Sequence, residues 1–397
     1  WPLGRGSIYS LAVVRTIPAL LSLVIAGVLV ASLASASPAK RLGEAWQAYE
    51  AGDYAKARKL AGAIRKGALR NDDYRLYILA QSRALLGDCR RAGRDFRTLS
   101  KISGSRFAGI AGWRAADCEW QTGQIRAAQR SYRRLLDKGQ KKRKLRGDLS
   151  LAEFRIGAAE ARIGKRKRAK DLLRAFLIDH PLHPMAGEAE RILRKLGRLD
   201  PLTANERLRR AKRLTAAKKW HESIAELERI DDAIPESLRR QRDFWIGMTL
   251  FKMRRQYARA GTILLGLYNQ MGSNAARALF HGARALSRAD KDKEAIRFYQ
   301  RVVREYPRTR WAAEAQYLSG WLEFNMGNYR EALPYLERMQ KLYPRSRYAR
   351  LAHWFLGMSH FFLGEYDKAL PIFERVGNGK GRLSGGKGRY WRARTLQ

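Results

Sequence analysis

The stretch that decides the fold is Gly327-Asn328-Tyr329-Arg330-Glu331-Ala332, because its pattern, Gly-x-Tyr-x-x-Ala, recurs along the chain. Two further full copies are Gly52-Asp53-Tyr54-Ala55-Lys56-Ala57 and Gly364-Glu365-Tyr366-Asp367-Lys368-Ala369. Weaker copies begin at Gly87, Gly123, Gly164, Lys218, Arg255 and Asp290, and most neighbouring copies start 35 to 37 residues apart. A period of this length predicts stacked two-helix units, because one such unit cannot bury its apolar face without neighbours. The sequence therefore predicts an all-α superhelical solenoid of about nine repeats.

Side-chain size follows a fixed pattern ahead of each copy. A large apolar residue lies ten positions before the copy begins, at Leu42, Tyr77, Trp113, Phe154, Leu208, Trp245, Phe280, Tyr317 and Trp354. A small or slender residue follows three positions later, at Ala45, Ala80, Ala116, Gly157, Ala211, Met248, Ala283, Gly320 and Gly357. Residues three apart share one helical face, so a bulky side chain is expected beside a notch where the partner helix approaches closely. The opening residue of the copy then ends the first helix, and its alanine, as in Ala57, Ala332 and Ala369, begins the buried stripe of the second.

Prolines mark the expected ends of two second helices. Pro307 and Pro344 each follow a tyrosine, and a proline at this point stops a helix. With the stretch Tyr306-Pro307-Arg308-Thr309-Arg310-Trp311-Ala312, the pattern resembles the tetratricopeptide repeat family, especially its envelope-type variant with Tyr-Pro-x-Ser/Thr-x-x-Ala between units. The resemblance covers nearly everything from residue 40 onward. It implies that the aromatic and alanine positions of the repeat serve core packing.

The first 36 residues are typical of a secretory signal peptide. Residues 1–36 contain Arg5 and Arg15, no acidic residue, and an apolar run over 17–33 that ends in Ala34-Ser35-Ala36. This pattern predicts cleavage after Ala36. The alternative is an uncleaved membrane anchor, because the uncharged stretch over 16–39 approaches membrane-spanning length. On both interpretations the repeats are exported to the periplasm or cell envelope, and the chain meets a membrane only through an uncleaved N-terminal segment.

The remaining chain is divided by breaks in the period. The interval of 54 residues between Gly164 and Lys218 predicts a spare helix over 185–196 and a boundary near residue 200. We therefore expect a first helical array over 37–200 and a second over 201–376. A glycine-rich connector is predicted over 377–389. Residues 390–397 have Tyr390 and Ala393 at the large and small positions, so they are expected to begin a further repeat of a longer protein.

The charge of the chain predicts an anionic partner. There are 80 Lys and Arg residues against 37 Asp and Glu, a net charge of +43. Such an excess attracts nucleic acid, acidic membrane surfaces or anionic polymers. Because export argues against nucleic acid, peptidoglycan or another anionic envelope polymer is expected, or a partner protein or peptide held in the groove of the solenoid. The densest basic run, over 138–146, is interpreted as a solvated loop between repeats.

The residues that could carry chemistry are few. Cys89 and Cys118 lie in neighbouring repeats and are predicted to form a disulfide in an exported protein, with two buried free thiols as the alternative. His180 and His183 have no carboxylate or cysteine at metal-ligand spacing. Glu222-Ser223 resembles the catalytic pair of lytic transglycosylases but lacks the Gly-Leu-Met-Gln-type segment that follows it there. We predict no catalytic, cofactor-binding or metal site in these 397 residues.

Two hypotheses of function follow. The stretch Tyr390-Trp391-Arg392-Ala393-Arg394-Thr395-Leu396 resembles a helix in the repeats of soluble lytic murein transglycosylases, which lie ahead of a lysozyme-like domain. That resemblance implies a domain that binds and orients peptidoglycan, with the catalytic domain outside this chain. The alternative is a non-enzymatic periplasmic scaffold for envelope assembly or cell division, because similar repeats hold partner peptides in a concave groove. A nucleic-acid-binding array has the charge in its favour and the export signal against it.

Overall fold

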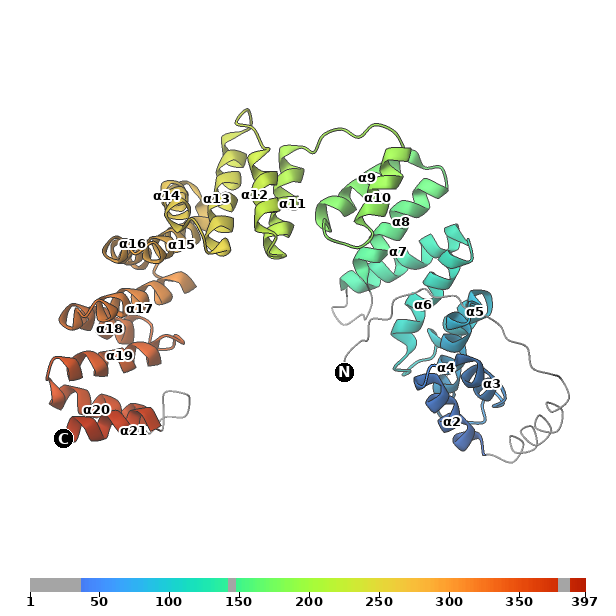
Figure 1. Cartoon of the computed structure of the whole chain (residues 1–397), viewed down its shortest axis with the longest axis horizontal. Helices are drawn as coiled ribbons and strands as arrows, with labels where there is room; N and C mark the ends of the chain where they lie inside the picture. Colours follow the sequence, from blue (N-terminus) through green and yellow to red (C-terminus); the bar gives the residue numbers. More distant parts are fainter. Residues whose placement is uncertain (1–36, 142–147, 378–385) are drawn as a thin grey trace, which may run out of the picture. The chain divides into compact units, whose positions relative to one another are not determined.

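A computed structural model describes residues 37–141, 148–377 and 386–397 (Figure 1). These residues form twenty α-helices and two short 3-10 helices, η1 (Tyr268–Gln270) and η2 (Gly272–Asn274), with no strand in the described part. Nine helix pairs account for eighteen of them. The first helices of the pairs are α2 (Pro38–Glu50), α4 (Asp72–Leu85), α6 (Ala108–Gln121), α8 (Leu149–Arg162), α11 (Ala204–Ala216), α13 (Glu236–Met253), α15 (Ala275–Arg288), α17 (Arg310–Asn325) and α19 (Ala349–Phe362). The second helices are α3 (Tyr54–Gly62), α5 (Cys89–Leu99), α7 (Ile125–Lys141), α9 (Arg166–Asp179), α12 (Trp220–Glu228), α14 (Tyr257–Leu267), α16 (Asp292–Glu305), α18 (Tyr329–Leu342) and α20 (Tyr366–Gly377). The predicted all-α solenoid of helix pairs is confirmed.

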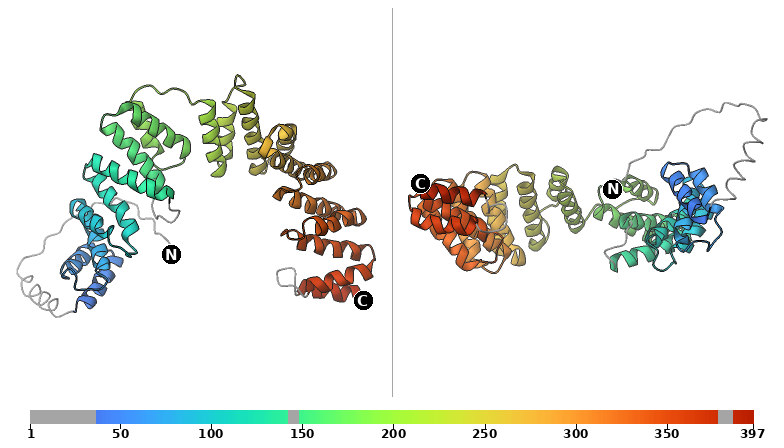
Figure 2. Two further views of the ribbon diagram at one scale, coloured as in Figure 1. Left: turned by 180° about the vertical axis from the view of Figure 1, so that it is seen from behind. Right: turned by 90° about the horizontal axis from the view of Figure 1, so that it is seen from below.

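Two helices stand outside the pairs, α10 (Ala186–Lys195) and α21 (Gly386–Leu396). The spare helix predicted over 185–196 is α10. The chain separates into two compact units, and residues 188–196 belong to the first while 175–187 and 197–397 belong to the second. Residues 197–203, where we placed the boundary near residue 200, are not helical. Figure 2 allows the helix pairs of each unit to be followed from two further sides.

The turn inside each pair depends on a left-handed backbone conformation. Gly327 has a φ of 81° and Gly364 a φ of 75°, and the glycines that open the other copies have similar values. A residue with a Cβ adopts this conformation at a cost, which explains why most copies open with glycine. Lys218 and Asp290 accept it without glycine, with φ of 62° and 59°. The predicted ends of these first helices are thereby confirmed.

One predicted copy is displaced by one residue. Helix α13 ends at Met253, and the left-handed residue that follows it is Arg254, with a φ of 60°, and not Arg255. Gln256 is also left-handed, with a φ of 54°, so α14 begins three residues after Arg254. In the other pairs the second helix begins two residues after the left-handed residue, as Tyr329 does after Gly327. The prediction was wrong for the end of α13 because this turn is one residue longer than its neighbours, whereas it was right for α14, which begins two residues after Arg255 and buries Ala260.

The longer turn moves the packing positions of α13 as well. Gly247, seven residues before Arg254, forms the notch, because a Cβ there would lie 2.8 Å from Cγ of Leu264. Phe244, ten residues before Arg254, is the large buried residue. Trp245 and Met248, which we placed in these two roles, each lie one position too late.

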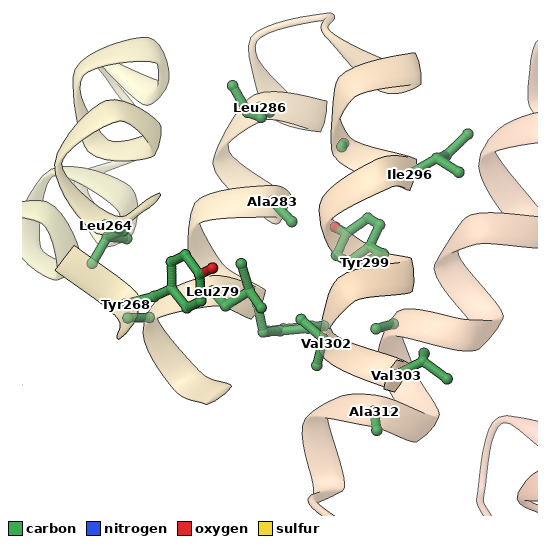
Figure 3. Close-up of a cluster of buried hydrophobic side chains, with 14 of the residues drawn as sticks. Leu264, Tyr268, Leu279, Ala283, Leu286, Ile296, Tyr299, Val302, Val303 and Ala312 are labelled. Carbon is green, nitrogen blue, oxygen red and sulfur yellow. The ribbon is translucent and has the colours of Figure 1, made fainter. Parts of the chain in front are cut away.

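The notches at Gly320 and Gly357 are filled by the second helix of their own pairs, as predicted. A Cβ on Gly320 would lie 2.7 Å from Cδ2 of Leu336, and one on Gly357 would lie 2.8 Å from Cγ2 of Ile372. The signature alanines, including Ala57, Ala332 and Ala369, are fully buried. Figure 3 shows such packing between α14 and α17, where Leu279, Ala283, Tyr299 and Val302 form one continuous apolar cluster.

Replacing Gly320 with alanine is expected to destabilise the second unit by about 1–3 kcal/mol, since the added methyl group overpacks against Leu336. Gly266 provides the matched control, because it lies in helix α14 with nothing within 4 Å of its missing Cβ. Gly266→Ala should raise stability by up to about 1 kcal/mol through helix propensity alone. Urea unfolding of the two variants measures both effects. Equal behaviour of the two alanines would contradict the role given to the notch.

The C-terminal part differs from the predicted connector over 377–389. Residues 378–385 lie outside the described residues, but helix α21 already begins at Gly386. A Cβ on Gly388 would lie 2.6 Å from the backbone nitrogen of Gly377, so this glycine permits the close approach of α20 and α21. Tyr390, which we placed at the large packing position, is 58% exposed. The neighbouring Trp391 packs instead, with ring centroids 5.0 Å from Phe361.

The signal-peptide region 1–36 and the cleavage site at Ala36 lie outside the described residues, so both stay predictions. Among the residues that the structure does describe, no helix combines the length and the hydropathy needed to cross a membrane.

Candidate partner-binding face

The first helices of the second unit lie side by side. Helix α11 contacts α13, and the contacts continue from α13 to α15, α17 and α19 (Figure 1). Second helices of neighbouring repeats have no contacts of this extent among the described residues. Closer approach on one side of a stack makes that side concave. We call this side of the second unit the first-helix face.

Three cations lie on successive helices of this face. They are Lys252 on α13, Arg277 on α15 and Arg310 on α17, and none forms an ion pair with any described residue. Burial lowers the pKa of Arg277, and the nearby charge of Arg310 lowers it further. Burial likewise lowers the pKa of Lys252, with a second contribution from Arg277. Arg277 is half-buried, whereas Lys252 and Arg310 are exposed at either side of it. Arg277 therefore loses hydration and is repelled by its cationic neighbours without a compensating carboxylate among the described residues.

Aromatic rings contact two of these cations, Arg277 and Arg310. The Arg277 guanidinium lies 5.4 Å from the ring centroid of Phe244 and 5.7 Å from that of Trp245. The Arg310 guanidinium lies 4.1 Å from the ring centroid of Trp311. Such contacts attract a cation but leave its hydrogen-bond donors unused. These two arginines are thus positioned while their donors stay available to a partner.

A half-buried histidine lies among the same helices. The ring of His281 on α15 lies 5.0 Å from Phe251 and 5.0 Å from Trp311, and its Nδ1 has no hydrogen-bond partner. Burial lowers the pKa of His281 to about 3, and the charges of Arg277 and Arg284 contribute in the same direction. At neutral pH this histidine is therefore uncharged, and it adds nothing to the positive charge of the face.

A hollow of about 400 Å³ lies between α15, α16 and α17, toward the ends of the helices that carry Arg277 and Arg310. Tyr317 and Trp321 form part of its wall, and Arg288 and Asn325 supply polar groups. Oδ1 of Asp292, also on its wall, is buried without a hydrogen-bond partner. Donors and an acceptor are both present, so the hollow can receive a polar side chain or a peptide amide.

The residues singled out from the sequence serve the scaffold. Gly52, Gly87, Gly123, Gly164, Gly327 and Gly364 form turns. Pro307 and Pro344 follow the ends of α16 and α18. Ser223 is fully buried and hydrogen-bonds Thr215 and the carbonyl of Ala211, so the Glu222-Ser223 pair has a structural role here. No group of three His, Cys, Asp or Glu residues in the described part could hold a metal ion.

The two cysteines meet in one buried cluster of the first unit, as free thiols. The Cys89 thiol donates to Oε1 of Gln121 at 2.7 Å. Burial raises the pKa of Cys118, and a hydrogen bond with Cys89 raises it further. The structure thus has the two buried free thiols that we gave as the alternative to a disulfide. Its formation on oxidation stays a prediction.

Lys252, Arg277, Arg310 and Arg288 were missed by the sequence analysis. Their only sequence signal is their place on the first helices, which becomes visible once the turns fix the register. Together the paired helices and this face define an α-helical repeat protein with a surface suited to binding.

Comparison with known families agrees with that class. Two family models, each described as a tetratricopeptide repeat, match residues 277–309 and 317–381. The chain thus carries tetratricopeptide repeats in its second unit, and its place in this superfamily is supported. No curated protein sequence matches the chain.

Several solved structures resemble the chain at low identity. Yeast Tom70 is 14% identical with a TM-score of 0.35, covering 91% of this chain and 89% of its own. A tetratricopeptide repeat protein from Parabacteroides merdae is 13% identical with a TM-score of 0.31, covering 72% and 98%. The TPR2AB domain of yeast Sti1, solved in a complex with pHSP90, is 14% identical with a TM-score of 0.27, covering 72% and 98%. None of these matches links the chain to lytic transglycosylases.

Proposed function

We propose that the second unit binds an acidic, extended segment of a partner protein along its first-helix face. Tetratricopeptide repeats suggest a protein–protein interaction scaffold. The proposal of an acidic ligand rests on Lys252, Arg277 and Arg310, which lie on three successive first helices. None of the three forms an ion pair with a described residue, and burial lowers the pKa of Lys252 and of Arg277. Cations that are partly buried without a partner lower stability, and an arriving carboxylate removes that penalty.

The spacing of the helices suggests the pattern of the ligand. Packed helices lie about 8–10 Å apart, and an extended chain rises about 3.3 Å per residue. Acidic residues at every third position would therefore meet cations on successive first helices. The hollow beside Arg288 and Asn325 would receive a polar side chain or an amide of the same segment.

The test uses a fluorescein-labelled peptide with glutamate at every third position and proline between, since proline keeps it extended. We expect saturable binding that falls about tenfold or more in the triple variant Lys252→Gln, Arg277→Gln, Arg310→Gln. Lys293, Arg297 and Arg338 are exposed on second helices and provide a control triple variant of the same composition and charge. Fluorescence anisotropy should show less than about a twofold change in that control. Equal losses in both triples would show that general charge attraction, and not this face, binds the peptide.

The place of action and the glycan alternative rest on the sequence alone. The apolar run over 17–33 and Ala36 support export to the periplasm, and the stretch 390–396 with the basic charge supports peptidoglycan binding as part of a lytic transglycosylase. Sedimentation of the chain with insoluble peptidoglycan at rising salt tests the latter. Retention at high salt that the face triple variant does not reduce would favour the glycan over an acidic peptide.

A further inference from the structure

The geometry points to a second binding site, in the first unit, for a phosphate group carried by a small molecule. The site is a hollow of about 540 Å³ at the turn between α6 and α7, next to the end of α8. Three arginines line it, Arg126 and Arg130 on α7 and Arg162 on α8. No acidic residue is among its lining residues. We refer to it as the arginine hollow.

The charge of the arginine hollow is not compensated within the described residues. Arg126, Arg130 and Arg162 form no ion pair there, although carboxylates lie in the same helices. The two buried carboxylates among them are already engaged, since Glu119 accepts from Arg97 at 2.8 Å and Glu160 accepts from both Arg133 and Arg168. The unit therefore pairs its buried carboxylates with other arginines and leaves these three available.

The three arginines lie at defined positions on two helices. Arg126 and Arg130 are one turn apart on α7, so they lie on the same side of that helix. Arg162 is the last residue of α8, and its guanidinium lies 4.5 Å from the ring centroid of Trp120. Arg155 lies 4.3 Å from the same ring, so Trp120 helps to hold the end of α8 beside α6. Two like charges one turn apart repel each other, and a shared anion between them relieves the repulsion.

The chemistry of the lining selects a phosphate. A guanidinium presents paired N–H donors that match two oxygens of a phosphate, and three of them can serve all the terminal oxygens of one group. A phosphomonoester carries close to two negative charges at neutral pH, whereas a carboxylate or a phosphodiester carries one. The hollow, of about 540 Å³, is shallow and open to solvent, and its three arginines are exposed, so a small phosphorylated molecule can reach them directly. A phosphomonoester or pyrophosphate on a small molecule therefore fits the arginine hollow better than a polymeric diester.

Isothermal titration of the full chain with inorganic pyrophosphate tests the proposal. We expect saturable binding with one site, at least about tenfold weaker in Arg126→Gln, Arg130→Gln, Arg162→Gln. The matched control is Arg58→Gln, Arg90→Gln, Arg94→Gln, because these three arginines are exposed in the same unit, and two of them are also one turn apart on one helix. The control should change the affinity by less than about twofold. No saturable binding, or an equal loss in both triples, would overturn the proposal.

Two further measurements separate phosphate binding in the arginine hollow from lost packing and from attraction to any polyanion. The double variant Arg126→Gln, Arg130→Gln leaves the Arg162–Trp120 contact intact, so it should weaken pyrophosphate binding while its thermal unfolding stays that of the parent protein. A short DNA duplex provides the phosphodiester arm, and we expect it to compete poorly with pyrophosphate. A duplex that displaces pyrophosphate stoichiometrically would contradict the small-molecule assignment. The triple variant of the first-helix face should bind pyrophosphate as the parent does, which separates this site from the proposed function.

Discussion

Acidification from pH 6.5 to pH 4.5 is expected to cost the second unit about 2 kcal/mol of stability through His281 alone. Burial first, and then the charges of Arg277 and Arg284, lower the pKa of His281 from 6.5 to about 3. The unfolded chain therefore takes up a proton in this range and the folded chain does not. The contribution of His281 is complete above pH 6.5 and is lost as pH falls toward 3. Urea unfolding at several pH values measures the slope.

The control for this prediction is a difference between variants, because carboxylates also titrate below pH 5. His281→Leu removes the group with little change of volume and should flatten the pH dependence between 6.5 and 4.5. His221→Leu removes an exposed histidine of the same unit and should leave the parent slope unchanged. If the free energy of unfolding of the His281→Leu variant falls with pH as steeply as that of the parent protein, then other groups produce the acid sensitivity.

The second large effect is expected at Glu160, which is 1% exposed and pairs with Arg133 and Arg168. The double variant Arg133→Met, Arg168→Met should destabilise the first unit by about 3–5 kcal/mol, since it leaves a buried carboxylate without a cation. Adding Glu160→Gln to the same protein should recover most of the loss, because the stranded charge is then removed. Urea unfolding of the double and triple variants measures both steps.

The triple variant decides whether charge or packing is responsible. Methionine keeps most of the arginine stem, so lost packing is small in both proteins. If the Glu160→Gln triple variant is no more stable than the double variant, the arginines act through packing and not through charge. The exposed pair Arg91 and Asp88 provides a baseline, and Arg91→Met should change stability by less than about 1 kcal/mol.

The sequence was sufficient for the fold because its signal is local and repeated. Gly327 or Gly364 marks a turn by itself, since the left-handed conformation favours a residue without a Cβ. The turn at Arg254 and Gln256 leaves no such mark, and its extra residue became visible only in the backbone. Gly388 was wrongly assigned to a flexible connector. The sequence alone does not distinguish a glycine that permits close contact between two helices from a glycine in a flexible linker.

The candidate face could not be predicted in this way. With 80 Lys and Arg residues in the chain, sequence cannot say which of them lack a carboxylate. Arg284 forms an ion pair with Glu314, thirty residues further along the chain, at 2.9 Å. Arg277 lies two turns earlier on the same helix and forms no ion pair with any described carboxylate. That distinction is made by the stacking of α15 on α17 and by nothing within either helix. The same holds for Arg126 and Arg130 in the arginine hollow.

The turns without glycine have a consequence for how the second unit melts. Lys218, Arg254, Gln256 and Asp290 are the non-glycine residues with positive φ in the described chain, and they fall in three consecutive repeats. Each such residue raises the energy of its own repeat by about 1 kcal/mol or more. The stability of a repeat array is approximately the sum of the stabilities of its repeats and of the interfaces between neighbouring repeats. Three consecutive strained repeats therefore form a region that can unfold before the rest of the second unit. We expect the backbone amides of these repeats to exchange their hydrogens faster than those of neighbouring repeats, because these repeats unfold locally at a lower free energy. Lys252 and Arg277 lie in the same repeats. A ligand that contacts both residues would therefore stabilise the least stable part of the second unit and slow this exchange.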